Sequence, residues 1–317
     1  KAAELIKSAT DIIAQRGPDD QGIFIFENLA FGHRRLAIMD LSPMGHQPMT
    51  SRDGRFTMIF NGEIYNHLEL RAEILPGLEF KSTSDTETIL YAYIQIGAAL
   101  FPKLNGIFAL SIFDNLTKEI VIARDQFGIK PLYFYQKDDN FYFASELKSL
   151  LGLEIDRAID HNALSHYLYF LYSPGEQTPF LHVKKMKPGH FISFNIENPS
   201  TFNYQQYYDI PFDGKYVDRQ EEELVEEVDT HLTKAVERQL LSDVPVGFFL
   251  SGGLDSSAMV ALARKLHPDK KINSYTIDTG GGFDGFEDDL KYAKIVAKHL
   301  NVELDILKTE IDIVKDF

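Results

Sequence analysis

Residues 246–257 read Val-Gly-Phe-Phe-Leu-Ser-Gly-Gly-Leu-Asp-Ser-Ser, an apolar run followed by a loop with two glycines. A helical pattern over residues 256–266 follows at once, so the predicted order is strand, loop, helix. Glycines let a backbone approach an anion closely, and amides and hydroxyls at a helix start donate to it. The stretch predicts a pyrophosphate-binding loop. The plain alternative is an ordinary Gly-Gly turn with a capping Ser or Asp.

Outward from this loop, helix and strand patterns alternate. An apolar stripe predicts a helix over residues 225–240, and residues 290–300 predict another, while 272–277 and 304–307 read as strands. This alternation is typical of a parallel α/β sheet. Between residues 195 and 220 the periodicity is lost and prolines collect, so we place a domain boundary near Asp213.

The first half has a different pattern. Short strands rich in Phe, Tyr, Ile and Val are expected at 56–60, 108–113, 120–123 and 141–144, and a helix at 86–100. Ser84 with Glu87 three residues later predicts a capping box at the start of that helix. This half should therefore combine antiparallel sheet with packed helices.

Composition limits the classes of function. The chain has 317 residues, enough for two domains, and a formal net charge of −15, which opposes binding to nucleic acid or anionic lipid. No apolar run is long enough to span a bilayer and no signal peptide is evident, so a cytoplasmic protein is expected. Cysteine is absent, which excludes disulfides, thiolate metal sites and a thiol nucleophile within these residues.

Four short motifs in the first half each have a plain structural explanation. They are Arg-Gly-Pro-Asp at 16–19, His-Arg-Arg-Leu-Ala-Ile at 33–38, Asn-Gly-Glu-Ile-Tyr-Asn at 61–66 and Ser-Asp-Thr-Glu at 84–87. Asn61-Gly62 is a strong hairpin-turn signal, and Arg35 could form a surface ion pair.

Taken together and in order, these motifs resemble those of the glutamine-hydrolysing asparagine synthetases. The loop itself resembles the pyrophosphate loop of ATP pyrophosphatases, and residues 127–133 (Phe-Gly-Ile-Lys-Pro-Leu-Tyr) and 143–146 (Phe-Ala-Ser-Glu) also fit. The resemblance implies an α+β Ntn-hydrolase sandwich of αββα type over residues 1–212, a type 2 glutamine amidotransferase domain. Residues 213–317 would begin an α/β ATP-pyrophosphatase domain, like the adenine nucleotide alpha hydrolases.

The resemblance also assigns residues to a glutamine site. Such a site needs a guanidinium fork for the carboxylate, acceptors for the ammonium group and donors for the amide oxygen. By resemblance, Arg35 binds the carboxylate, Glu63 and Asp85 lie near the amino group, and Asn61 with the Gly62 amide forms the oxyanion hole. Backbone of the segment after Arg35 adds further contacts, at Leu36, Ala37, Ile38 and Met39.

For the second domain the resemblance implies ATP and Mg²⁺. Ser251, Gly252, Gly253, Ser256 and Ser257 would hold the phosphates, and the backbone at Leu250 and Ile277 would hold the adenosine. Asp255 would oppose a bare phosphate, but it could bind the magnesium that accompanies a nucleotide.

The sequence departs from the family in three places. Members use an N-terminal cysteine as nucleophile, with its own amino group as base, whereas this sequence begins at Lys1 without one. In the family, most of the synthetase domain, including the acceptor site, follows the position of Phe317. The 317 residues alone are therefore not expected to carry out the complete synthetase reaction. We favour a fragment over a true loss of the nucleophile. The glycine-rich stretch 279–289 is expected to be a surface loop or, alternatively, a sign of another acceptor.

The resulting prediction is a glutamine-dependent asparagine synthetase, a carbon–nitrogen ligase. Glutamine hydrolysis would supply ammonia, ATP would adenylate aspartate, and ammonia would displace AMP. One alternative is an amidotransferase for another carboxylate, such as a sugar acid of polysaccharide synthesis. A second is an inactive glutamine- or ATP-binding relative. A homodimer is expected only by analogy.

Overall fold

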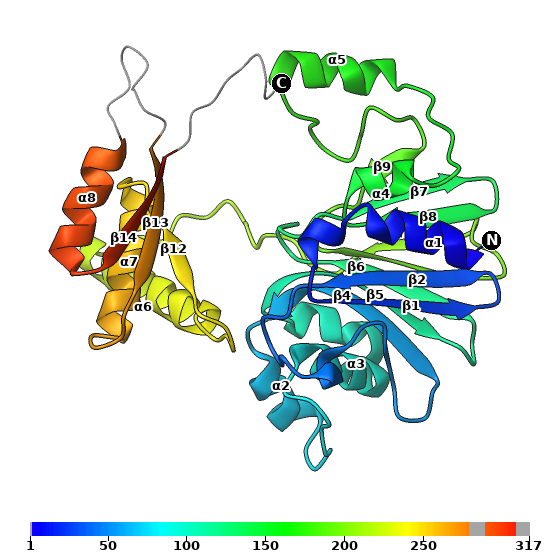
Figure 1. Ribbon diagram of the computed structural model, residues 1–317, viewed down its shortest axis with the longest axis horizontal. Helices are drawn as coiled ribbons and strands as arrows, with labels where there is room; N and C mark the ends of the chain where they lie inside the picture. Colours follow the sequence, from blue (N-terminus) through cyan, green and yellow to red (C-terminus); the bar gives the residue numbers. More distant parts are fainter. Residues whose placement is uncertain (1, 279–288, 309–317) are drawn as a thin grey trace. The chain divides into compact units, whose positions relative to one another are not determined.

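The computed structural model describes residues 2–278 and 289–308. The chain divides into two compact units, Lys1–Asp213 and Gly214–Phe317 (Figure 1). The predicted glycine-rich connection at 279–288 lies outside the described residues. Each unit is considered by itself below.

A six-stranded antiparallel sheet forms the centre of the N-terminal unit, with strand order β11-β10-β6-β5-β4-β3. Its strands are β3 (Met49–Thr50), β4 (Phe56–Ile64), β5 (Gly106–Asp114), β6 (Glu119–Arg124), β10 (His190–Asn195) and β11 (Asn203–Gln206). Six successive residues of β5 are buried, from Phe108 to Phe113. A strand buried on both faces must lie between two packed layers.

Two smaller sheets supply the second sheet layer. One is the hairpin of β1 (Asp20–Phe26) and β2 (Leu29–Arg35); the other has the order β8-β7-β9, with β7 (Tyr133–Lys137), β8 (Asn140–Ala144) and β9 (Val183–Lys185). The Phe31 ring of β2 lies 6.1 Å from the Phe143 ring of β8. The two small sheets are therefore neighbours in one layer.

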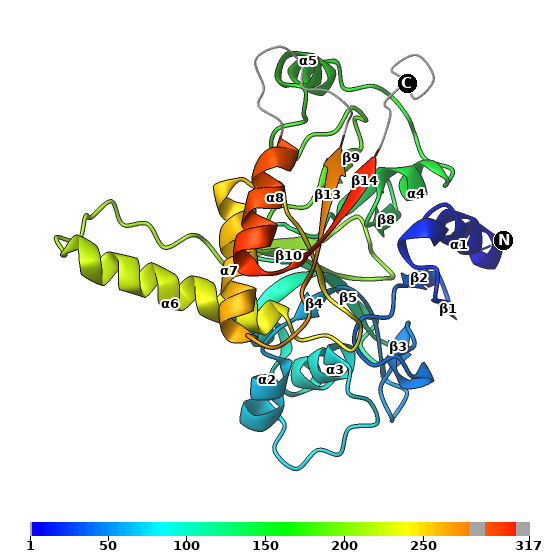
Figure 2. The same cartoon turned by 60° about the vertical axis from the view of Figure 1, so that its left-hand side comes forward.

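Helices cover the outer faces of both layers, as Figures 1 and 2 show. The helices α2 (His67–Ile74) and α3 (Asp85–Ile96) lie against the large sheet, while α1 (Ala2–Asp11) and α4 (Leu147–Leu151) pack on the small ones. A further helix, α5 (His161–Phe170), is largely exposed. Short 3-10 helices span Ala14–Arg16, Pro43–Gly45 and Gly97–Lys103. The layer order is therefore helix, sheet, sheet, helix, as the αββα prediction requires.

Sequence patterns located the strands well but two local predictions were wrong. Asn61 and Gly62 lie inside β4 and form no hairpin turn. Ser84 does cap α3, accepting from the Thr86 amide at 3.1 Å, but the Glu87 carboxylate binds the Ser82 amide at 2.7 Å and so does not complete a capping box. The helix also ends earlier than expected, at Ile96, because Gly97 has a φ of 60°.

The C-terminal unit contains a three-stranded parallel sheet with order β12-β13-β14. Its elements are α6 (Glu221–Gln239), β12 (Gly247–Phe249), α7 (Leu254–Leu266), β13 (Asn273–Asp278), α8 (Asp289–Leu300) and β14 (Glu303–Lys308). The predicted alternation of helix and strand is confirmed, with shifts of one or two residues at most boundaries.

Within the described part of this unit, helices cover one face of the parallel sheet. The helices α7 and α8 lie on the same side of β13 and β14 in Figure 2, and Ser274 and Thr276 are buried beneath them. On the opposite face Phe249, Ile277 and Leu307 are each more than half exposed. The predicted apolar stripe of α6 is also largely exposed, and only its Val236 is buried. Across the described ranges, no helix is long and apolar enough to cross a membrane.

The loop after β6 is held by a buried arginine–aspartate pair. Asp125 is 1% exposed, and its carboxylate accepts from the amides of Phe108, Phe127, Ile129 and Lys130 at 2.9–3.2 Å. The Arg124 guanidinium donates to the carbonyls of Gly128 and Lys130 and to that of Met186. These bonds tie both ends of the loop to β5 and satisfy polar groups that would otherwise be buried unpaired.

Replacing Asp125 should therefore destabilise the N-terminal unit. Asp125→Ala leaves one buried and three partly buried amides without this acceptor, and we expect a loss of about 3 kcal/mol of unfolding free energy. Asp139→Ala, at an exposed hairpin, serves as the matched control and should change it by about 0.5 kcal/mol or less. Denaturant unfolding of both variants measures the difference; equal stabilities would contradict this role of Asp125.

Candidate active site

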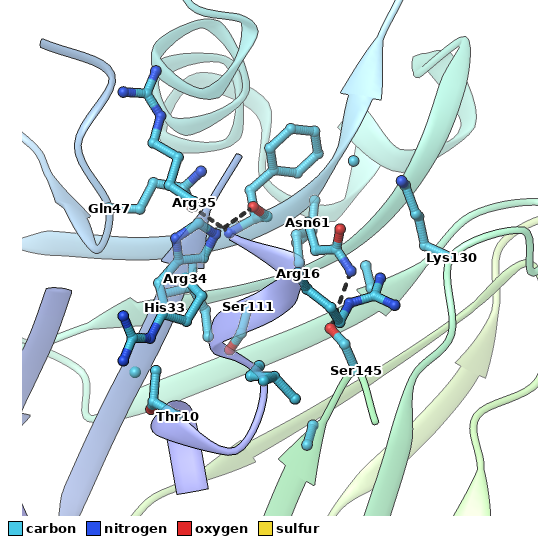
Figure 3. A pocket seen from close by; sticks show the side chains of 18 of the residues that line it. Thr10, Arg16, His33, Arg34, Arg35, Gln47, Asn61, Ser111, Lys130 and Ser145 are labelled. Atoms are coloured by element: carbon cyan, nitrogen blue, oxygen red, sulfur yellow. Dashed lines mark hydrogen bonds between the residues drawn. The ribbon is translucent and has the colours of Figure 1, made fainter. Parts of the chain in front are cut away.

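The N-terminal unit holds a pocket of about 310 Å³ enclosed by both of its sheet layers. Its floor is formed by β4 and β5, its walls by β2 and β8, and its roof by α1 and α4. Figure 3 shows polar side chains from these elements, including His33, Asn61 and Ser111, around the pocket. The predicted glutamine-site residues line it, except Ala37, whose amide instead donates to Asp19 at 2.8 Å.

The backbone of β4 places the Gly62 amide at the pocket. Phe108, which is opposite Gly62 in the β4–β5 ladder, directs its own amide and carbonyl to Asp125, and so does not bond to Gly62. In an antiparallel pair this means that the amide of Gly62 points away from β5. The amides of Phe60 and Ile64 point the same way and are taken by Gln47 at 2.6 Å and Asp85 at 2.9 Å.

The Gly62 amide lies between these two occupied amides and has no hydrogen-bond partner among the described residues. Only glycine fits there, since a Cβ atom would lie 2.2 Å from the Ile107 carbonyl oxygen. The neighbouring Asn61 donates one amide hydrogen to the Ser145 hydroxyl at 3.1 Å (Figure 3), which leaves its second hydrogen for a ligand. Two donors on adjacent residues can together stabilise a developing oxyanion.

Arg35 is 8% exposed, so the alternative of a surface ion pair is wrong. Its guanidinium donates to the carbonyls of Met39, Asp40 and Ser42, which folds the segment after β2 around it. These three bonds use three of the five donors of the fork. The bonds occupy both Nη2 hydrogens and one Nη1 hydrogen, so the Nε hydrogen and one Nη1 hydrogen remain for a ligand. Leu36, Ile38 and Met39 of the same segment line the pocket.

Glu63 and Asp85 place two carboxyl groups at the pocket. Asp85 is buried in the first turn of α3, and burial raises its pKa to about 6. Burial, and secondarily the charge of Asp85, raises the pKa of Glu63 to about 7. Like charges in a partly dry site disfavour double ionisation, so the pair is arranged to accept a cation. Among the described residues, the Glu63 carboxylate has no hydrogen-bond partner.

Sequence reasoning assigned no role to several pocket residues that the structure brings in. Arg16, Lys130 and Ser145 line the pocket, although each stands in a motif that carries the resemblance. His33 and Ser111 were also missed. The pKa of His33 falls to about 4 because the ring is buried, so it is neutral.

The inner end of the pocket has the form of a slot between two strand edges. β2 and β8 each end their small sheet, and the pocket separates them. The His33 Nε2 atom lies 3.0 Å from the Phe60 carbonyl and so carries the proton, which leaves Nδ1 as an acceptor. Neither this Nδ1 nor the Ser111 hydroxyl has a partner in the described part of the chain. Unsatisfied buried polar atoms beside two open strand edges suit the amides of an added strand.

In the C-terminal unit, the predicted phosphate loop connects β12 to the start of α7. Gly252 has a φ of 83°, and a Cβ atom there would lie 2.4 Å from the Ala293 amide nitrogen of α8. Ser251 and Ser256 face each other across the loop with their hydroxyl oxygens 3.0 Å apart. Glycine is thus required twice over at position 252, for conformation and for space.

The other predicted nucleotide residues lie around this loop. Leu250 is buried and its amide donates to the Tyr275 carbonyl at 2.8 Å, while Ile277 lies near the end of β13 and is exposed. Carboxyl ends of parallel strands beside a helix start are where nucleotides bind in α/β sheets. Asp255 and Ser257 lie in the first turn of α7. The described residues contain no group of three or more potential metal ligands.

The raised pKa of Glu63 predicts that ionising this carboxyl lowers the stability of the folded protein at high pH. A carboxyl whose folded pKa is raised is neutral in both states below its unfolded pKa near 4.5, and the penalty for ionising it is complete above about 7. Glu63→Gln should therefore leave stability unchanged at pH 4.5. At pH 8 it should raise the unfolding free energy by about 1–2 kcal/mol, after allowance for solvent screening.

Denaturant unfolding at the two pH values tests this expectation, with Glu79→Gln at an exposed position as control. A Glu63→Gln variant that is no more stable than the parent at pH 8 would contradict the electrostatic assignment.

A family model described as "Glutamine amidotransferase domain" matches residues 1–208, and one described as "Asparagine synthase" matches residues 227–316. Among solved structures, glutamine phosphoribosylpyrophosphate amidotransferase from B. subtilis, complexed with ADP and GMP, is 15% identical with a TM-score of 0.47. That match covers 96% of this chain and 62% of the other.

Curated relatives match nearly the whole chain. Asparagine synthetase (glutamine-hydrolyzing) 1 of Bacillus subtilis is 41% identical over 95% of this chain and 46% of its own length. Putative asparagine synthetase (glutamine-hydrolyzing) 2 of Methanocaldococcus jannaschii is 35% identical over 95% of this chain and 61% of its own. Amidase chry2 of Gibberella zeae is 30% identical over 98% and 48%, respectively. The chain thus spans about half the length of these relatives. It belongs to the glutamine amidotransferase domain family, whose model matches residues 1–208, and it is similar to the glutamine-hydrolysing asparagine synthetases named above.

Proposed function

We propose that the N-terminal unit binds glutamine and hydrolyses its side-chain amide. The observation that carries this proposal is the open amide of Gly62, flanked by two occupied amides and next to the Asn61 carboxamide. These donors would receive the amide oxygen as it becomes an oxyanion. Arg35 would take the carboxylate through its two remaining donors, and Glu63 with Asp85 would take the ammonium group.

The nucleophile would come from outside these 317 residues. We propose that a strand carrying the N-terminal cysteine of the family enters the slot between β2 and β8 and joins the two small sheets. Its thiolate would attack the amide carbon, and ammonia would leave with a proton from the cysteine's amino group. Water would then cleave the thioester to give glutamate and restore the thiol. The unpaired polar atoms of His33 and Ser111 support this placement because they suit backbone groups of such a strand.

For the C-terminal unit we propose ATP binding at residues 250–257. The loop glycines and the first amides of α7 would hold the phosphates, and the backbone at Leu250 and Ile277 would hold the adenosine. A magnesium ion would neutralise phosphate charge, and Asp255 is placed to bind it directly or through water. The strand–loop–helix order and the requirement for glycine at position 252 support this assignment.

In the whole protein, ammonia from glutamine would convert an activated carboxylate to an amide, and aspartate is the acceptor we propose. This rests on the names of the Bacillus and Methanocaldococcus relatives. A different carboxylate remains the second candidate, and the Gibberella relative, which carries another name, favours it. The homodimer stays a prediction. The alternative of an inactive relative that only binds glutamine or ATP also stays a prediction, and release of glutamate in the assay below would exclude it.

The glutaminase proposal is tested by glutamate release from glutamine in the full-length protein. Asn61→Ala removes one oxyanion donor and should lower kcat by about 10²- to 10³-fold. Asn140→Ala, at the exposed first residue of β8, should leave kcat unchanged. No glutamate release from a protein confirmed to begin with cysteine would refute the proposal.

The nucleotide proposal is tested by ATP–Mg²⁺ binding measured with calorimetry. Gly252→Ala forces a Cβ atom into α8 and should abolish detectable binding. Gly214→Ala is the matched control, because Gly214 also has positive φ, at 74°, but its Cβ atom would meet nothing within 4 Å. Equal affinity in both variants would place the nucleotide elsewhere.

A further inference from the structure

Lys130 is a cation of the pocket that the proposed function leaves without a role. It is half-buried, and its side chain lines the same pocket as Glu63. Within the described residues neither the Lys130 ammonium nor the Glu63 carboxylate forms a hydrogen bond or an ion pair. Figure 3 shows Lys130 and Arg16 among the side chains that line the pocket, each from a different segment. A lysine that is partly desolvated and unpaired needs an explanation, because burying its charge is costly.

The backbone of Lys130 is fixed at both of its polar groups. Its amide donates to the Asp125 carboxylate at 3.0 Å, and its carbonyl accepts from the Arg124 guanidinium at 2.8 Å. Asp125 also accepts from the amide of Phe108, which is opposite Gly62. One buried carboxylate therefore sets the position of Lys130 relative to the strand that carries Glu63.

The charges around Glu63 show what this placement achieves. Asp85 of α3 opposes ionisation of Glu63, whereas Lys130 is the cation that favours it and lowers its pKa. On Lys130 itself, burial is the largest influence and lowers its pKa; Arg16 acts in the same direction, while Glu63 and Asp125 oppose it. Tyr65, also near Glu63, has its own pKa raised to about 12 and is neutral. Lys130 is thus a counter-charge to the Glu63–Asp85 pair. A protonated Glu63 would bind the ammonium group of a ligand poorly.

We propose that Lys130 is a positioning residue of the glutamine site, whose ammonium keeps the Glu63 carboxylate ionised and ready for the ammonium group of the ligand. This inference rests on the proposed function for its ligand but not for its electrostatic part. Lys130 acts through Glu63, without touching the reacting amide. Its removal should impair binding near neutral pH and have little effect once Glu63 ionises on its own.

The first test needs no ligand. Side-chain carboxyl resonances are titrated by ¹³C NMR in the parent chain and in Lys130→Met, with Glu63→Gln to assign the signal. The upper apparent pKa of the Glu63–Asp85 pair should rise by about one unit in Lys130→Met and by much less in Lys130→Arg. Lys103→Met removes an exposed cation paired with Glu73 and should leave it unchanged. An unchanged pKa in a folded Lys130→Met protein would overturn the proposal.

The second test measures glutamine affinity across pH in the full-length protein. With a pKa near 7 rising by one unit, the ionised fraction of Glu63 falls about fivefold at pH 7 and less than twofold at pH 8.5. The dissociation constant, or KM in a turnover assay, should increase in the same proportions while kcat changes little. A loss that is equal at both pH values would point to a structural effect and reject the role. Absence of glutamine binding in the parent would refute the proposed function and leave the NMR result standing.

Discussion

The buried carboxylate of Asp125 is the constraint on which the geometry of the N-terminal unit depends. The carboxylate accepts the amide of Phe108, so the β5–β6 ladder ends there on a side-chain acceptor. Phe108 therefore makes no backbone bond to Gly62, which pairs with it in β4, and the Gly62 amide points away from β5 toward the pocket. The same carboxylate fixes the loop that carries Lys130. The open Gly62 amide and the Lys130 cation are thus both placed by one buried residue.

The site combines well-satisfied backbone with poorly satisfied charge. Phe60 and Ile64 of β4 have side-chain acceptors for their amides, whereas Glu63 between them lies on a strand that offers its carboxylate no donor. Such an arrangement costs stability, and it is the kind of conflict expected where a ligand supplies the missing partner. The ammonium group of an amino acid has the positive charge that would balance this acidic pair and the donors that the Glu63 carboxylate lacks.

Much of this could be predicted from sequence because it depends on local pattern. Short runs rich in Phe, Tyr, Ile and Val identified β4, β5, β6 and β8, and the glycine loop identified the β12–α7 junction. The hairpin turn expected at Asn61–Gly62 does not form, because pairing with β5 overrides the local turn propensity. Gly62 pairs with Phe108, which is 46 residues later in the sequence. The roles of Lys130 and Ser111 depend on contacts across the fold, and no local pattern in the chain encodes those.

The face of the C-terminal sheet opposite α7 and α8 has a consequence for handling the protein. Phe249, Ile277 and Leu307 are exposed apolar side chains on this face, whereas parallel sheets normally bury both of their faces. Water is a poor solvent for these apolar side chains, while Glu303 and Asp305 on the same face of β14 add negative charge that repels a second copy of the chain. Concentrated solutions should therefore show attractive colloidal behaviour that salt strengthens, since screening removes the repulsion while leaving the apolar face unchanged.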